Sequence, residues 1–422
     1  MRKRTIALSF AALACLSMYG CVNVVLPAVP NRVVGPAPQP ELELAAPGDA
    51  RARPFSGAEI SALADPDATR RDLEQYVYGA MPPAPPLDIE AQEVIAASAF
   101  GGLGQVEQVT LRVAPGERGV FNLAIAVPTN VDGPAPVVIM QVFGGLAAAF
   151  DCFEGVGPPP GVPARECRQG GFEHFMVHAI FGKYASGPPF EELLSHGYAV
   201  AIMYAGDVFP DRAEAGLAAL ERTAAPEGPR WGAIAAWAWL YSRAVDYLES
   251  DDRFDPERMA VWGHSRNGKS ALVAAAWDSR IDAVIAHQSG TGGATLSRSY
   301  AGESVGEITQ SYPHWFTPAY AEYADREDDL PIDQHQLLAL IAPRPVLLGN
   351  SIRDAWSDPE GAYRAAMAAD AAYEALGSEG LDQTGMRAGN MTADLAFFTR
   401  PGHHGVTVRD WSYFREFLDA HF

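Results

Sequence analysis

Serine, aspartate and histidine side chains that can cooperate in acyl transfer stand at three places in this chain. Ser265 comes first, Asp354 and Asp358 follow, and the pair His403 and His404 lies near the end of the 422 residues. A serine hydroxyl is a weak nucleophile until a base takes its proton and a carboxylate orients that base. These residue types, in this order, predict a site that forms a covalent acyl intermediate on serine.

Ser265 lies at the apex of a sharp turn between two regular segments. Residues 259–262 form a short apolar run of strand length, residues 263–268 read Gly-His-Ser-Arg-Asn-Gly, and residues 269–277 are rich in Ala and Leu. Strand, tight turn and helix with serine at the apex are typical of a nucleophile elbow, in which the helix N-terminus points free N–H groups at the hydroxyl. The alternative is an ordinary strand-to-helix turn whose serine caps the helix.

The candidate carboxylates follow a predicted strand. Residues 344–349 have the pattern of a buried strand, and Asp354 and Asp358 lie in the loop after it. Asp358 precedes Pro359, and this pair suits the cap and the first position of a helix. Asp354 is therefore the preferred acid.

The last predicted strand, residues 395–399, leads into the two histidines. In an α/β-hydrolase sheet the nucleophile, the acid and the base follow in this order, each in a loop at the carboxyl end of a strand. Either histidine alone is as well explained as a surface or capping residue. The position after the strand favours a catalytic role for one of them and leaves open which one.

The rest of the chain alternates strands with helices, as judged from apolar runs and from apolar side chains at helical spacing. This alternation predicts an α/β fold of the α/β-hydrolase type, a three-layer sandwich with a mostly parallel central sheet. The first two strands, joined by a Pro-Gly turn, predict an antiparallel hairpin. The predicted strands are residues 107–113, 120–127, 136–142, 197–204 and 283–287, and the predicted helices are residues 56–78, 231–248, 334–341, 359–376 and 410–421.

Two loops allow more than one interpretation. Residues 143–145, Phe-Gly-Gly, follow a buried strand and form either a simple turn or part of an oxyanion hole. Residues 150–189 are rich in Gly and Pro and lack a clear period. A loop of that length in a compact domain is usually functional or loosely ordered, and the sequence leaves open whether it closes over a substrate.

Composition restricts the partners. The formal net charge of −21 argues against binding nucleic acid or an anionic membrane surface. Residues 1–20, basic and then apolar, predict an export signal that is too short to span a bilayer. The sequence Met-Tyr-Gly-Cys at residues 18–21 is similar to a bacterial lipobox, which predicts lipidation of Cys21. The alternative is cleavage to a soluble periplasmic or secreted form.

The expected organisation is a signal over residues 1–20, a Pro- and Ala-rich tether over residues 21–55 and one catalytic domain over residues 56–422. We expect an exported, periplasmic or outer-membrane-anchored lipoprotein that is monomeric. Cys152 and Cys167 are predicted to form a disulfide in an exported protein, two free thiols being the alternative. No spacing of His and Cys in the sequence is typical of a metal site.

Four segments resemble the glucuronoyl esterases, carbohydrate esterase family fifteen. The likeness extends from about Asp67 to the C-terminus and is strongest from Trp231 onward. It implies an α/β-hydrolase fold, no cofactor, and cleavage of esters between lignin alcohols and 4-O-methyl-glucuronoyl groups on xylan. The matching segments are residues 263–269, 289–293, 313–316 and 330–344.

The resemblance also implies roles for single residues. Ser265 takes the place of the nucleophile, Arg266 that of an oxyanion partner, and Lys269 that of a contact to sugar hydroxyls. His404 fits the position of the base better than His403, because a glycine follows it. Two tryptophans are assigned to substrate binding: Trp356, near the position of a stacking residue, and Trp315, in the segment of residues 313–316.

One position departs from the family. Many members place a catalytic Glu just before the Ser-Gly-x-Gly-Gly run, and this chain has Gln288 there. A neutral amide cannot serve as the charged group that orients the base, so the acid is assigned to Asp354.

The sequence thus predicts a serine carboxylesterase that acts on uronate esters of plant or algal polysaccharide. Two alternatives remain open: an acetyl(xylan) esterase on the same fold, and a hydrolase-fold lipoprotein that binds glycans without turnover. The sequence leaves the natural alcohol and the polysaccharide undetermined.

Overall fold

The computed structural model describes residues 62–116, 119–150, 153–159, 181–184, 186–299, 301–387 and 389–422. The predicted signal, lipidation site Cys21, tether, and cysteine pair Cys152 and Cys167 lie outside these residues, as does most of the loop of residues 150–189. In the part of the chain that the structure describes, no helix has the length and apolar character needed to cross a bilayer.

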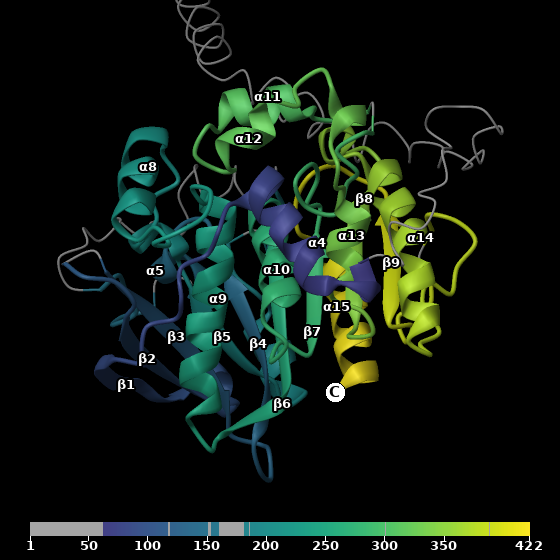
Figure 1. The fold of residues 1–422 in the computed structure, drawn as a ribbon. Coiled ribbons are helices and arrows are strands. Elements are labelled where there is room, and N and C mark those ends of the chain that lie inside the picture. Colours follow the sequence, from purple (N-terminus) through teal and green to yellow (C-terminus); the bar gives the residue numbers. More distant parts are fainter. Residues whose placement is uncertain are drawn as a thin grey trace, which may run out of the picture.

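The described strands form one nine-stranded sheet in the order β1-β2-β3-β5-β4-β6-β7-β8-β9 (Figure 1). The pairs from β1 to β3, and β3 with β5, are antiparallel, whereas every pair from β5 through β4 and on to β9 is parallel. The predicted mostly parallel α/β sheet is therefore confirmed. The strands are Ile89–Ala99, Gly104–Arg112, Val120–Pro128, Ala135–Gln141, Ala199–Met203, Phe254–His264, Ala283–His287, Val346–Ser351 and Leu395–Arg400 for β1 to β9.

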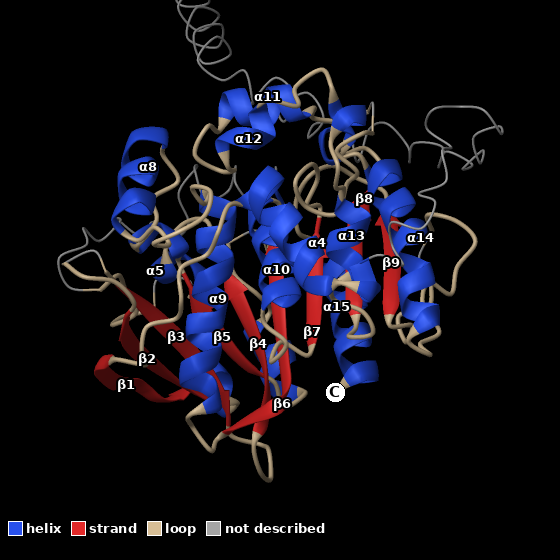
Figure 2. Ribbon diagram, in the orientation of Figure 1, coloured by secondary structure: helices blue, strands red, loops and turns tan. Residues whose placement is uncertain are grey.

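Helices cover both faces of the sheet, as the secondary-structure colouring in Figure 2 shows. The longer helices are α4 Pro66–Leu73, α8 Ala213–Arg222, α9 Ala233–Glu249, α10 Arg266–Trp277, α14 Pro359–Ala375 and α15 Val408–His421. The shorter α-helices are α5 Leu146–Ala149, α7 Phe190–Ser195, α11 Val305–Ser311, α12 Pro318–Ala321 and α13 Gln334–Ala339. Single turns of other helix types are η2 Glu74–Tyr78, η3 Phe100–Gly102, η4 Ala205–Asp207, η5 Glu327–Asp329 and η6 Ala355–Ser357.

Side chains of the central strands point alternately to the two faces of the sheet, and this divides the hydrophobic core in two. In β4, Val137 and Ile139 pack in the core on one side of the sheet, while Val138 and Met140 pack in the core on the other. This follows from the two-residue period of a strand, which sends successive side chains to opposite faces. The first core also contains side chains of α9, α10, α13 and α14, and the second those of α7 and α15. Three layers result.

The first strand was not predicted from the sequence. β1 pairs with β2 at the edge of the sheet, and most of its eleven residues are exposed. Without a buried face the strand lacks alternating polarity, which is the main sequence signal of a strand. The segment between β7 and α13, for which the sequence predicted no helix, contains α11, whose Ser304 and Glu307 form a capping box.

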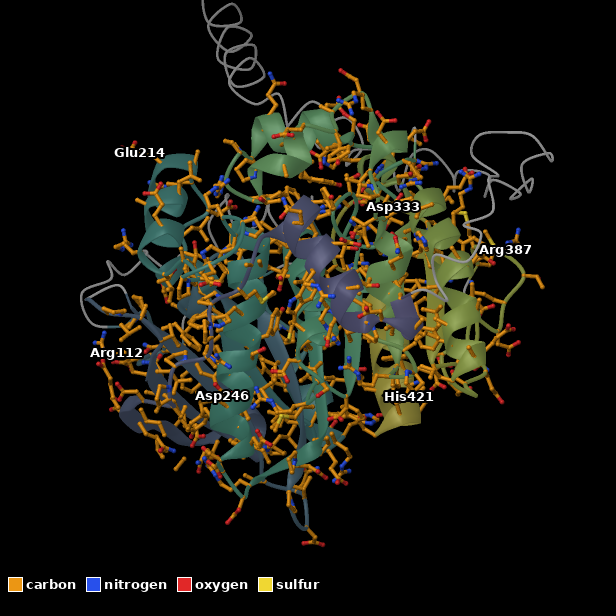
Figure 3. The ribbon with its side chains drawn as sticks, viewed as in Figure 1. Arg112, Glu214, Asp246, Asp333, Arg387 and His421 are labelled. Carbon is orange, nitrogen blue, oxygen red and sulfur yellow. The ribbon has the colours of Figure 1, made fainter. Side chains whose placement is uncertain are left out.

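The loop after β7 is tied to α13 through Asp333, which is labelled in Figure 3. The Asp333 carboxylate is completely buried, accepts the backbone N–H of Ser297 at 2.7 Å and pairs with Arg298 Nε at 2.8 Å. This fixes residues 289–299 at the end of the sheet where α11 and α12 lie, the top of Figure 1. Because parallel strands end at a common edge, the loops after β6, β8 and β9 meet there as well.

Candidate active site

Ser265 occupies a strained turn between β6 and α10. Its φ of 57° and ψ of −127° are unusual for a residue with a side chain, and such strain is typical of the serine in a nucleophile elbow. The flanking glycines are required by close packing: a Cβ on Gly263 would lie 2.0 Å from the carbonyl oxygen of Asn267. The strand, turn and helix predicted around Ser265 are therefore present, with α10 starting at Arg266 rather than at Lys269.

The loops after β8 and β9 bring Asp354 to His404. The Nδ1 atom of His404 lies 2.7 Å from Asp354 Oδ2. Burial would raise the pKa of the Asp354 carboxyl, but the charge of His404 and the hydrogen bonds from His404 and Ser357 outweigh it, so the pKa is lowered. Asp354 is thus held as an anion against the imidazole.

The two neighbouring candidates have other contacts. Asp358 caps α14, because its side chain accepts the backbone N–H of Gly361 at 3.0 Å. The Nδ1 atom of His403 lies 3.4 Å from the carbonyl oxygen of Arg353. Of the candidate acids and bases, the structure brings Asp354 and His404 together, and these two remain the proposed pair.

His404 lies beside the elbow. Its ring centroid is 4.6 Å from that of His264, the residue directly before Ser265. Because Nδ1 faces Asp354, the nitrogen left to exchange a proton is Nε2. Ser265 thus stands on a strained turn, and the imidazole of His404, paired with Asp354, packs against the residue before it. These are the elements of an activated nucleophile.

Arg266 is held by groups outside the elbow. Its Nε lies 3.1 Å from Asp211 Oδ2, and its guanidinium carbon is 4.7 Å from the ring centre of Phe143. The other Asp211 oxygen accepts from Trp315 Nε1 at 2.8 Å and lies 2.9 Å from His314 Nε2. Phe143 belongs to the loop of residues 143–145, so this loop adjoins the cation beside the nucleophile.

The hydrogen bond from Trp315 to Asp211 and the burial of the Trp315 ring change the role assigned to this residue. The side chain is only 4% exposed, and its ring stacks on Tyr312 with centroids 3.8 Å apart. A ring covered in this way offers a substrate little surface, so its assignment to substrate binding is corrected. Trp315 instead supports Asp211, and through it Arg266.

Lys269 is buried in the same turn of α10. Its ammonium group donates to the carbonyl oxygens of Ser289 at 2.6 Å and Thr291 at 2.5 Å, which leaves one of its three N–H bonds for another acceptor. Burial lowers the pKa of Lys269 to about 8, against the opposing charges of Glu303 and Asp354. Lys269 therefore lies between the elbow and the loop after β7.

Glu303 is a site residue that the sequence did not single out. Burial raises the pKa of its carboxyl to about 7, and the charges of Lys269 and His404 oppose that shift. Its Oε1 atom is buried without a hydrogen-bond partner among the described residues. The backbone N–H of Glu303 donates to the carbonyl oxygen of Trp356 at 3.1 Å, and the Trp356 side chain is 47% exposed. The segments that carry this carboxyl group and the exposed Trp356 ring are therefore joined through their backbones.

Glu303 and Asp211 carry no local sequence signal. Asp211 lies in the loop after η4, and Glu303 lies in the segment between β7 and α11. Neither belongs to a motif whose spacing points to the elbow, so only the fold reveals them. Within the described residues, no group of three or more His, Cys, Asp or Glu side chains is arranged to hold a metal ion.

The fold and the elbow together place the chain in the α/β-hydrolase class. A family model described as "Glucuronyl esterase, fungi" matches residues 226–377. Carbohydrate esterase MZ0003, from an unknown prokaryotic organism, is 45% identical over 238 residues, which cover 55% of this chain and 55% of that protein. A 4-O-methyl-glucuronoyl methylesterase of Wolfiporia cocos is 36% identical over 154 residues, 34% of this chain and 38% of the relative. The chain thus spans about half, or less, of the length of the curated relatives it matches.

Solved structures match over a longer stretch. A promiscuous CE15 esterase from a marine bacterial metagenome is 34% identical, with a TM-score of 0.72, over 84% of this chain and 91% of that one. A glucuronoyl esterase from Solibacter usitatus is 33% identical, with a TM-score of 0.70, over 86% of this chain and 92% of that one. The chain therefore belongs to carbohydrate esterase family 15.

Proposed function

We propose that the protein is a serine carboxylesterase that hydrolyses esters of uronic acids, the glucuronoyl esters of plant or algal polysaccharide. The observation that carries the proposal is the first turn of α10, where Arg266 follows Ser265 directly and Lys269 lies three residues further on. A cation beside the nucleophile stabilises an oxyanion, and a second one suits a polar sugar acyl group. The names of the family relatives support the same substrate class.

In the first half-reaction the Oγ atom of Ser265 attacks the ester carbonyl carbon while its proton moves to Nε2 of His404. Asp354 holds the opposite nitrogen of His404 and stabilises the imidazolium that forms. The carbonyl oxygen becomes an oxyanion next to Arg266, whose charge stabilises it. The intermediate then collapses, the C–O bond to the alcohol breaks, and the leaving oxygen takes the proton from His404.

The second half-reaction repeats these steps in reverse order, with water in the place of the alcohol. His404 takes a proton from a water molecule, whose oxygen attacks the carbonyl carbon of the uronoyl–Ser265 ester. Collapse of the second tetrahedral intermediate breaks the bond to Ser265, which recovers its proton from His404. The uronate leaves, and the protein returns to its initial state without a cofactor.

The sugar would lie between the elbow and the loops after β7 and β8. Lys269 has one N–H bond to spare, and Glu303 has a free acceptor, so both suit sugar hydroxyl groups. The exposed ring of Trp356 suits the apolar face of a pyranose. An acetyl group would use none of these contacts.

An ester panel tests the proposal. The purified protein should release alcohol from benzyl or methyl glucuronate, and Ser265→Ala should abolish the release. Turnover of acetylated xylan or aryl acetates alone would instead indicate an acetyl esterase. Binding of glucuronoxylan without turnover of any ester would indicate a glycan-binding protein.

We also propose that the chain is exported and anchored by a lipid on Cys21, which residues 1–21 support by their basic, apolar and lipobox-like pattern. Cys21→Ser should release the protein from membranes into the periplasmic fraction. Unchanged fractionation of the variant with membranes would refute the anchor.

A further inference from the structure

Gln288 contacts the chain on both sides of His404. The backbone N–H of Gly405 donates to Gln288 Oε1 at 2.8 Å, and Gln288 Nε2 donates to the carbonyl oxygen of His403 at 3.3 Å. These are the two residues that flank His404 in sequence. One side chain therefore brackets the proposed base from β7, two strands away from β9.

The chemistry of the partners fixes which end of the amide faces which group. A peptide N–H can only donate and a carbonyl oxygen can only accept, so the bracket needs one acceptor and one donor on the same side chain. Glutamine supplies both. An ionised carboxylate of the same length has no donor, and its charge would face the carbonyl oxygen of His403. The Nε2 atom of Gln288 also donates to Ser351 Oγ, at the end of β8.

Gln288 is itself held firmly. Its side chain is 1% exposed, and its backbone adopts a φ of 49°, in the left-handed region. Such a conformation is unfavourable for a residue with a side chain and persists only where the surroundings impose it. The surroundings do so here, because the Gln288 N–H donates to the carbonyl oxygen of Gly349 at 2.8 Å and its own carbonyl oxygen accepts from Ser357 Oγ at 3.3 Å.

Arg400 holds the same loop. Its guanidinium donates to the carbonyl oxygens of Gly405 and His403, and its Nε lies 2.6 Å and 2.7 Å from the two oxygens of the buried Asp410. Both residues that flank His404 are therefore bonded to an anchored cation and to the amide of Gln288.

We propose that Gln288 is a positioning residue that holds His404 in line with Ser265 and Asp354, and that this position requires an amide rather than a carboxylate. The inference rests on the proposed function, in which His404 is the base. It gives the departure of Gln288 from the family's Glu a positive role in this chain. Gln288 acts through the backbone of the His404 loop and needs no contact with the substrate.

Two variants separate the bracket from a merely structural role. Gln288→Met keeps the length and removes all three side-chain hydrogen bonds, whereas Gln288→Glu keeps the acceptor and removes the donor. We expect either change to lower kcat for benzyl glucuronate about 30- to 100-fold at pH 8, because a displacement of about 1 Å costs on that order. KM should change less than about threefold, since no contact to substrate is lost.

The acid form of the Gln288→Glu variant provides a second readout. A protonated carboxyl has a carbonyl acceptor for the Gly405 N–H and one O–H donor, so it restores one of the two bonds that the amide nitrogen donates. The ratio of variant to wild-type kcat should therefore rise as the pH falls and the buried carboxyl takes up its proton. The titratable and charged groups that face position 288 are the same in both proteins: His287 on β7, Asp354, Arg400, His404 and Asp410.

Gln336→Glu is the matched control for placing a carboxylate in a buried site. Gln336 is also buried, but its Oε1 only accepts, from the backbone N–H of Asp333 at 3.0 Å, which a carboxylate does equally well. This variant should keep kcat within about threefold of wild type. Thermal melting of all three variants checks the fold, and Gln288→Met decides the question if Gln288→Glu does not fold.

The rate at which a fluorophosphonate labels Ser265 measures how well His404 activates the serine hydroxyl, and it does so without the uronate substrate. The inference predicts slower labelling of both Gln288 variants than of wild type. It is overturned if either folded variant keeps wild-type kcat and labelling rate at pH 8, or if the Gln288→Glu ratio does not change with pH. A wild-type protein that is labelled but inactive on uronates would revise only the substrate. A wild-type protein that the fluorophosphonate does not label would overturn the proposed function and the role of Gln288 with it.

Discussion

Asp354 Oδ2 lies 2.7 Å from His404 Nδ1, although 50 residues separate them in the chain. The contact arises because β8 and β9 are adjacent parallel strands, paired from Val346 with Leu395 to Ser351 with Arg400. Their carboxyl ends lie at one edge of the sheet, so the loops that follow meet there. This pair orients the imidazole toward the elbow.

Asp354→Asn should lower kcat on a uronate ester by about 10³- to 10⁴-fold, as loss of the orienting carboxylate does in serine triads. The amide can accept from His404 but cannot stabilise the imidazolium by charge. Steady-state kinetics with benzyl glucuronate measures the effect, and thermal melting should show little loss of stability.

Asp358→Asn is the matched control, because Asp358 lies four residues further on and caps α14. Asparagine caps a helix about as well as aspartate, so the change should cost less than about 1 kcal/mol of stability and little activity. Near-full activity of the Asp354 variant with an inactive Asp358 variant would mean that the other aspartate is the acid.

Asp211→Asn should weaken the hold on Arg266, because the neutral amide no longer pairs with the guanidinium at 3.1 Å. We expect kcat/KM to fall about 10-fold, and the double variant with Arg266→Ala to be little worse than Arg266→Ala alone, as expected for residues that act together. Asp329→Asn removes a comparable but exposed ion pair with Arg326 and should leave kcat/KM unchanged. If the losses of kcat/KM in the two single variants add up in the double variant, Asp211 does not act through Arg266.

Trp356→Ala should raise KM for a glucuronoxylan ester about 10-fold and change kcat little, since an exposed ring contributes contact with bound substrate rather than with the reacting atoms. Leu376→Ala, an equally exposed apolar residue at the end of α14, is the control. An unchanged KM for the Trp356 variant would exclude the ring from the sugar site.

The raised pKa of the Glu303 carboxyl leads us to expect a specific dependence of the unfolding free energy on pH. Burial raises its folded-state pKa to about 7, above the ordinary value of 4.5, so the folded chain keeps a proton that the unfolded chain releases. Stability from this group is present below pH 4.5 and is lost as the pH rises through 7. Glu303→Gln should therefore gain about 1–3 kcal/mol relative to wild type between pH 5 and pH 8, as measured by urea unfolding. A constant difference between the two proteins would contradict the raised pKa.

The sequence predicts the parts of this molecule that have a local pattern. Buried strands and amphipathic helices have periods, and the order of the strand ends predicts that an aspartate after β8 and a histidine after β9 meet. The choice of His404 over His403 came from the resemblance to the family. β1 was missed because an exposed edge strand has no apolar face. Trp315 was misassigned because sequence shows that a tryptophan is present but not whether its ring is covered.

Other features of the site depend on long-range packing. Asp211 meets Arg266 from the loop after η4, and Glu303 meets Lys269 from the segment before α11. The second glycine of the elbow follows the serine by three residues, and a Cβ there would lie 3.0 Å from the carbonyl oxygen of Gly263. The sequence predicts that Gln288 is not the acid, but its contacts with both neighbours of His404 are visible only in the fold.

The most direct test is peptide mapping of the protein after reaction with a fluorophosphonate, which forms a stable adduct only with an activated hydroxyl. A single adduct should form on the peptide that contains Ser265. It should be absent from Ser265→Ala and form more slowly in Asp354→Asn. A wild-type protein without an adduct, or an adduct of equal yield in Ser265→Ala, would show that Ser265 is not the nucleophile of a serine esterase.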